Sequence, residues 1–257
     1  MISTLSSLSN NMQVRDKSVK VLQYAARMIC VHQQQQLSAV HTKVLTDLCF
    51  TCSMGRKVFR LGKSINSLHA LMGKLARLHK PPETVREVAF CLEMLEHIFI
   101  GLFYYYDHAL LLGRARLLPS YNAKLWEGRT YGTWFLHDFV LLVRKLLLLG
   151  TNAADQIQVE EGVRARYAAN QGDIEREVRV RLLALRRSQR HLLWDLAKAL
   201  CDINVSGRFF ANSDTGRALV QGFPFCREGV SARPIGYFGF VSAIMAIVEA
   251  VAVETAP

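Results

Sequence analysis

The chain has 257 residues, 51% of them hydrophobic and 21% charged, and its formal net charge is +11. This length holds one large or two modest domains, and the positive charge indicates a polyanionic partner, either anionic lipid or nucleic acid. Only six prolines interrupt the chain, and alternating strand-like runs are scarce. The sequence therefore predicts an all-α protein rather than a β-rich one.

The N-terminal part of the chain contains three predicted helices. The first two are amphipathic and cover residues 14–31 and 37–54, with a glutamine run at 33–36 between them. The third covers residues 55–80 and ends at Pro81, because a proline restricts the residue before it and cannot continue a helix.

Residues 55–80 form a basic amphipathic segment. No acid occurs between Asp47 and Glu83, whereas lysines and arginines are frequent there. Apolar residues recur at steps of three and four, so a helix through them has one apolar stripe and most cations on its other side. The stripe consists of Val58, Leu61, Ile65, Leu68, Met72 and Leu75. Such a helix suits the surface of an anionic bilayer, and a solvated face in a helical bundle is the alternative.

Two apolar segments follow. Residues 83–112 predict one long helix whose second half is apolar and aromatic, and residues 125–150 predict another intensely hydrophobic helix. The second of these contains His137, Asp138, Arg144 and Lys145, which are costly in hydrocarbon, so it is interpreted as a core or interfacial helix.

The C-terminal part begins with a predicted linker at residues 151–173, followed by a basic helix from residue 174. Residues 235–253 are the strongest transmembrane candidate, because Glu249 is the only charge in 19 residues and a span needs roughly 20. A buried helix of a soluble bundle is the alternative. We therefore divide the chain into a helical region (1–150), the linker, and a C-terminal region (174–257).

The sequence predicts no active site, metal or cofactor, and hence a protein that is not an enzyme. Nucleotide-binding, metalloprotease and hydrolase motifs are absent from it. Adjacent acid and histidine residues on a helix diverge by about 100°, so they are expected to bridge neighbouring helices instead of acting together. These pairs are Asp107 with His108 and His137 with Asp138. The Cys49–Cys52 pair is interpreted as packing thiols. Nucleic acid is not expected as a partner, because the cations accompany long apolar stretches.

Six segments occur in the order seen in one protein family: DKSVKVLQYAARM, GRKVFRLGKSINSLHALM, YYYDHALLLGRARLL, KLWEGRTYGTWF, RHLLWDLAKALCDI and PIGYFGFVSAIMAIV. Over residues 16–248 the chain resembles the peroxin-11 family, peroxisomal membrane proteins that elongate and divide the organelle. Kinetoplastid parasites have glycosomal relatives. RKVFRLGKS with its following stripe is the most specific of these pieces.

The resemblance implies a mechanism and a location. It implies that the basic helix inserts into the cytosolic leaflet of the peroxisomal membrane, or of the glycosomal membrane in a kinetoplastid, and that self-association then curves the membrane before fission. The implied partners are anionic phospholipid, other copies of the chain as a homo-oligomer, and the fission machinery. A metabolite channel is the alternative function. The implied membrane-binding residues are Arg56, Lys57, Phe59, Arg60, Leu61, Lys63, Ile65, Leu68, Met72, Lys74, Leu75 and Arg77.

Overall fold

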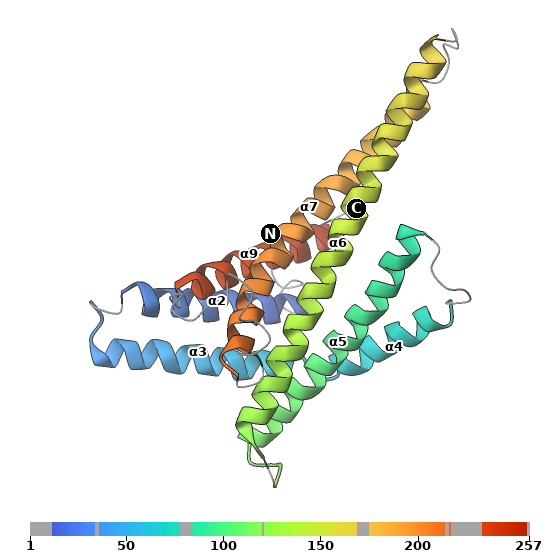
Figure 1. Cartoon of the computed structure of the whole chain (residues 1–257). Helices are drawn as coiled ribbons and strands as arrows, with labels where there is room; N and C mark the ends of the chain where they lie inside the picture. Colours follow the sequence, from blue (N-terminus) through green and yellow to red (C-terminus); the bar gives the residue numbers. More distant parts are fainter. Residues whose placement is uncertain are drawn as a thin grey trace.

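The computed structural model describes residues 12–33, 36–77, 84–119, 121–168, 175–213, 216 and 233–255. Within these ranges the chain forms seven α-helices, which confirms the predicted all-α class. Figure 1 shows a body of short and medium helices from which two long helices, α6 and α7, extend together as an arm.

The base of the body is a layer of three helices, α2 (Met12–His32), α3 (Ala39–Phe59) and α9 (Arg233–Thr255). The Ser38 hydroxyl accepts a hydrogen bond from the His41 amide (3.3 Å) and so caps the start of α3. Two glycines of α9 let its backbone approach α2 closely. A Cβ at Gly239 would lie 2.2 Å from the Tyr24 ring, and one at Gly236 would lie 3.1 Å from the Met28 backbone.

The second unit of the body pairs α4 (Lys63–Leu75) with α5 (Val85–Arg114), which lie side by side in Figure 1. A capping box begins α5, because the Thr84 hydroxyl accepts from the Glu87 amide while the Glu87 carboxylate accepts from the Thr84 amide. The long helix predicted over residues 83–112 is therefore confirmed, with its start fixed by these two residues.

The arm consists of α6 (Ala123–Ala168) and α7 (Glu175–Ala211). The structure differs here from the predicted linker, because residues 151–168 continue α6 as helix, and residues 169–174 lie outside the described part. Residues that are buried or half-buried recur in both helices at alternating steps of three and four, which is the heptad pattern of a coiled coil. On α6 they are residues 135, 138, 142, 145, 149, 152, 156, 159 and 163, and on α7 residues 178, 182, 185, 189, 192, 196, 199, 203, 206 and 210.

Polar contacts fix the antiparallel register of this coiled coil. The Gln156 amide donates to Gln189 Oε1 (3.0 Å), and the Ser206 hydroxyl donates to Asp138 (2.6 Å). Buried polar residues at heptad core positions specify register. The residue numbers in these pairs add up to 345 and 344. A residue of α6 therefore lies near the residue of α7 whose number brings the sum to about 345.

The arm joins the base layer through a buried polar contact. The Lys20 ammonium of α2 donates to Asp202 of α7 (3.0 Å) and to Ser242 of α9 (2.9 Å), and Ser242 in turn donates to Asp202 (2.5 Å). Aromatic packing continues this junction, with Tyr131 of α6 stacked on Phe209 of α7 at 5.0 Å between ring centroids. The base layer and the arm are thus tied together at one end of the coiled coil.

Candidate membrane-contact site

The α4 helix exposes an apolar face. Ile65, Leu68 and Met72 are 69%, 58% and 60% exposed, and Leu75 is 46% exposed. Leu61, just before the helix, is 57% exposed. Isolated exposed apolar residues are ordinary, but five on one helical stripe form a contiguous patch of the kind that marks an interaction site. We call these five residues the α4 stripe.

The polar face of α4 packs against α5. Ser67 is buried beside Gly101, where an added Cβ would lie 3.4 Å from the Ser67 side chain. Lys74 forms an ion pair with Glu93 (2.9 Å), and the Lys63 ammonium lies over the Tyr104 ring at 5.9 Å. The helix therefore turns its cations toward the protein and its apolar stripe away from it.

An elbow at residues 60–62 separates α4 from α3, so the predicted single helix over residues 55–80 is corrected to two. The α3 helix ends at Phe59, and α4 begins at Lys63. Gly62 has φ of 82°, in the left-handed region that a glycine adopts without steric cost. The periodic stripe masked this break, because Leu61 keeps its spacing through the elbow. Residues 78–80 of the predicted helix lie outside the described residues.

A buried group of charges holds the elbow. We call Asp16, Arg56, Lys57, Arg60 and Asp107 the ion cluster; it joins α2, α3 and α5. Asp16 accepts from Arg56 (3.1 Å) and Arg60 (3.3 Å), and Asp107 accepts from Arg60 (3.2 Å) and from Lys57. The two acid side chains are only 4% and 2% exposed. The next residue, His108, contacts the Arg60 carbonyl through Nε2 at 3.0 Å, which confirms that Asp107 and His108 bridge neighbouring helices.

The cations of the cluster determine the ionisation of Asp16. Burial alone would favour the neutral acid, but the charges of Arg60 and Arg56 hold the pKa of Asp16 well below its usual range. Asp16 is therefore a carboxylate at neutral pH, and its charge offsets part of the cost of burying two guanidinium groups.

The structure thus separates the twelve predicted membrane-binding residues into five cations engaged within the protein, five residues of the α4 stripe, and two others. The cationic ones Arg56, Lys57 and Arg60 belong to the ion cluster, while Lys63 lies 4.0 Å from Asp16 and Lys74 pairs with Glu93. Phe59 is half-buried at the end of α3, and Arg77 is exposed just after α4. The remaining five, Leu61, Ile65, Leu68, Met72 and Leu75, form the α4 stripe. Contact with lipid stays a prediction for all twelve.

Sequence reasoning missed the two acids that capture the cations. Asp16 and Asp107 are 91 residues apart in the chain, so no local spacing connects them to residues 56–60. One signal was present, because Asp107 is the only charged residue in the apolar run from Ile98 to Leu112. A lone acid in such a run needs a buried cation, and residues 55–80 hold seven lysines and arginines without an acid among them.

The α5 helix is the candidate membrane span of the structure. Among the described residues it is the one helix long and apolar enough to cross a bilayer, whereas the apolar part of α9, Ile235–Glu249, is shorter. One face of α5 is exposed and apolar through Leu95, Ile98, Leu102 and Leu112. The α4 stripe and this face belong to adjacent helices (Figure 1).

The ionisable residues in the apolar part of α6 are paired inside the bundle. Arg144 donates to both carboxylate oxygens of Glu96 (2.5 and 2.9 Å), and Lys145 forms an ion pair with Asp195. His137 contacts the Glu96 carbonyl at 3.4 Å, while its neighbour Asp138 binds Ser206. These partners agree with the prediction that residues 125–150 form a core or interfacial helix. The Cys52 side chain is buried, and the half-buried Cys49 thiol donates to the Gln23 carbonyl (3.4 Å), so both lie at the packing surface of α3. Burial raises the pKa of both thiols.

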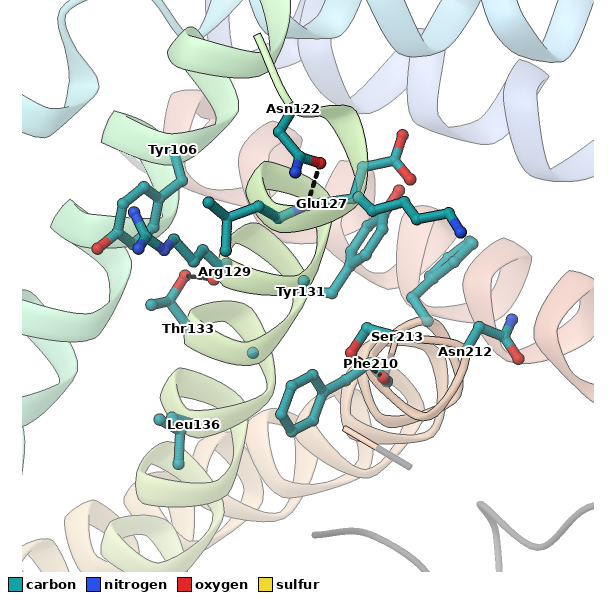
Figure 2. Close-up of a pocket in the computed structure, with 15 residues that line it drawn as sticks. Tyr106, Asn122, Glu127, Arg129, Tyr131, Thr133, Leu136, Phe210, Asn212 and Ser213 are labelled. Atoms are coloured by element: carbon teal, nitrogen blue, oxygen red, sulfur yellow. Dashed lines mark hydrogen bonds between the residues drawn. The ribbon is translucent and has the colours of Figure 1, made fainter. Parts of the chain in front are cut away.

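A hollow of about 1100 Å³ lies where the end of α5, the start of α6 and the end of α7 meet (Figure 2). Two of its polar side chains cap helix ends. Asn122 accepts from the Leu125 amide (3.2 Å), and the Ser213 hydroxyl donates to the Phe210 carbonyl (2.6 Å). In the described part of the chain, no group of three or more His, Cys, Asp or Glu residues could hold a metal.

Comparison with known proteins gives one family. Residues 2–251 match the family model of Peroxisomal biogenesis factor 11 (PEX11). The chain is 26% identical over 201 residues to "Peroxisomal membrane protein 11-3" of Oryza sativa subsp. japonica, covering 78% of this chain and 75% of the rice protein. It is 27% identical over 130 residues to "Peroxisomal membrane protein 11B" of Pongo abelii, covering 50% and 47% of the two chains. No solved structure matches.

Proposed function

The chain belongs to the peroxisomal biogenesis factor 11 family, a family of non-enzymatic peroxisomal membrane proteins that act in peroxisome biogenesis and proliferation, and we propose that it elongates the membrane by inserting the α4 stripe into one leaflet. The observation that carries this proposal is the orientation of α4. Its apolar residues face outward while its cations face α5 and the ion cluster.

The energetics favour the apolar stripe as the main anchor. Burying the exposed half of a Leu, Ile or Met side chain contributes about 1 kcal/mol, so the five residues together supply about 5 kcal/mol of membrane affinity. Because Lys63 and Lys74 are engaged within the protein, the attraction of cations to lipid phosphates is a smaller contribution than the sequence alone indicated. Arg77 at the exposed end of α4 remains suited to that role.

Insertion into one leaflet supplies the force for elongation. A helix that inserts its apolar face among the acyl chains of one leaflet adds volume to that leaflet, and the expanded leaflet then bends outward. The ion cluster supports this by holding the elbow at Gly62 against α5, so that α4 enters the leaflet alongside the candidate span, as its contacts with Gly101 and Glu93 require. Self-association would sum the curvature of many copies, and the elongated membrane would then be a substrate for fission machinery.

Tubulation of vesicles tests the proposal. The purified full-length chain is reconstituted into vesicles with anionic lipid, and tubules are counted by electron microscopy for the native chain and for two glutamate variants. Leu68→Glu lies on the stripe, whereas Asn66→Glu adds the same charge to an exposed position about 140° from the centre of the stripe. We expect tubules for the native chain and Asn66→Glu but not for Leu68→Glu. Equal tubulation by all three would refute insertion of α4.

The alternative function is a metabolite channel, and the same vesicles separate the two. A channel would release a small entrapped solute from vesicles that keep their shape, and Leu68→Glu would leave this release unchanged. We favour elongation because the ionisable residues of α6 are engaged by neighbouring helices: Asp138, Arg144 and Lys145 bind Ser206, Glu96 and Asp195.

A further inference from the structure

The outer face of α7 is strongly cationic along the arm. Residues 178–194 contain no acid and five arginines, all of them exposed: Arg179, Arg181, Arg186, Arg187 and Arg190. Among the described side chains, one ion pair is formed by these five, between Arg186 and Glu160 at 3.7 Å, and both partners are about half exposed. Arg186, Arg187 and Arg190 lie within about 100° of one another around the helix, whereas Arg181 lies on the opposite side, so we call these three residues the α7 arginine face.

The adjoining face of α6 has the opposite charge. Residues 152–163 of α6 contain Asp155, Glu160 and Glu161 and no lysine or arginine. The arm therefore has an acidic side and a cationic side at the same height, and an extended anionic surface would be attracted to α7 alone.

The arginine face lies at the level where α5 begins. Arg86, in the first turn of α5, forms an ion pair with Asp155 of α6, and the next residue, Gln156, contacts Gln189 of α7. Residues 186–190 therefore lie on the other side of α6 at the height of the first turn of α5. The helical rise puts them within about 6 Å of one another along the axis. A bilayer is about 40–45 Å thick and its hydrocarbon core about 30 Å, so each headgroup layer is roughly 6 Å thick. The three arginines thus span about one headgroup layer.

Apolar and aromatic residues lie on the body side of these arginines. Leu193 and Trp194 are 47% and 40% exposed, one turn closer to the level of the α5 interior. Tryptophan is enriched at the boundary between hydrocarbon and headgroups, and arginine pairs with the phosphates just outside it. Along α7, the tryptophan lies nearer the body and the arginines lie beyond it. This matches a membrane surface, where tryptophan lies at the edge of the hydrocarbon and phosphates lie outside it.

We propose that the α7 arginine face binds anionic phospholipid headgroups at the surface where α5 enters the bilayer, as a second membrane contact separate from the α4 stripe. This contact relies on the location of the chain in a membrane and not on insertion of α4. It would fix the height and the tilt of the arm, because arginines on one side of a rigid coiled coil hold that side against the phosphates.

Fluorescence quenching in bilayer discs tests the proposal. The full-length chain, one copy per disc, carries a genetically encoded fluorescent amino acid in place of Leu183, an exposed residue one turn from Arg186 on the same side of the helix. A matched control carries the same fluorophore in place of Gly162, which is exposed at nearly the same height on α6 and has open space around it. The discs contain phosphatidylcholine with or without phosphatidylserine, and a lipid with a nitroxide on its headgroup serves as the quencher.

We expect quenching at position 183 to be about twofold stronger with phosphatidylserine, and this gain to disappear in about 1 M salt, where screening shortens electrostatic reach to about 3 Å. Replacing Arg186, Arg187 and Arg190 by glutamine should remove the gain, whereas Leu68→Glu should leave the gain intact. The control fluorophore at 162 should be quenched equally in neutral and anionic discs. Equal quenching at position 183 in neutral and anionic discs, or a gain that survives the three glutamines, would overturn the proposal. A gain that occurs in crowded vesicles but not in single-copy discs would also overturn it, since that result would assign the face to a second copy.

Discussion

Replacing Asp107 by asparagine removes one of the two acids of the ion cluster. The cluster would then keep one acid, Asp16, for its three cations. The site is deeply buried, since Asp107 is only 1% exposed. Breaking a buried ion pair by removing one partner costs roughly 3–5 kcal/mol, because the other charge is left without compensation. Since a native protein is stable by about 5–15 kcal/mol, this single change should remove a large fraction of the stability of the body.

The complementary change should be mild. Lys57→Met removes a cation from a cluster in which Arg56, Lys57 and Arg60 outnumber the two acids, so the remaining charges are better balanced. Replacement of a buried charge by an apolar side chain of similar size is often neutral when its partner stays satisfied, and Asp107 keeps its bond to Arg60.

The free energy of unfolding, measured by denaturant titration in detergent micelles with circular dichroism, distinguishes these two cases. We expect Asp107→Asn to lower it by about 3 kcal/mol and Lys57→Met to change it by less than about 1 kcal/mol. Asp107→Asn should also make the elbow at residues 60–62 sensitive to protease. The reasoning would be refuted by equal effects of the two substitutions, or by a loss for Asp107→Asn below about 0.5 kcal/mol, the range of ordinary surface changes.

Three further outcomes follow from the same structure. Because the pKa of Asp16 is lower in the folded chain than in the unfolded one, its contribution to stability is complete above about pH 4 and falls as the pH drops further; Asp16→Asn should flatten that part of the pH–stability curve. Gly62→Ala should destabilise by about 1 kcal/mol in thermal unfolding, whereas Gly62→Asn should cost less, because asparagine tolerates positive φ. Gly239→Val should loosen α9 from α2, since even a Cβ would lie 2.2 Å from the Tyr24 ring; weaker protection of α2 amides in hydrogen exchange checks this, and unchanged protection would contradict it.

Periodicity identified the helices well. The patterns at residues 14–31, 37–54 and 83–112 correspond to α2, α3 and α5, because each presents one apolar face with a recognisable start or stop. The two errors also have local causes. Gly62 breaks a helix whose apolar spacing continues, and residues 151–168 look polar because only the narrow seam of a coiled coil needs to be apolar.

The candidate site could be only half predicted for a different reason. The α4 stripe depends on residues within 14 positions of one another, so the sequence alone identified it. The destination of the cations depends on Asp16 and Asp107, which tertiary packing brings to Arg60 from 44 and 47 residues away. In a sequence, a cationic surface and a buried ion cluster show the same run of lysines and arginines. Only the fold shows which acids lie beside them.

The most direct test of α4 insertion is to identify what touches the stripe in a membrane. A photo-crosslinking phenylalanine analogue is placed at Leu68 or at Asn66 in the full-length chain, in vesicles with anionic lipid, and the crosslinked products are identified by mass spectrometry. Insertion predicts that the analogue at position 68 captures acyl chains and that the analogue at position 66 does not. Crosslinks from position 68 to protein or water alone would contradict the insertion of α4.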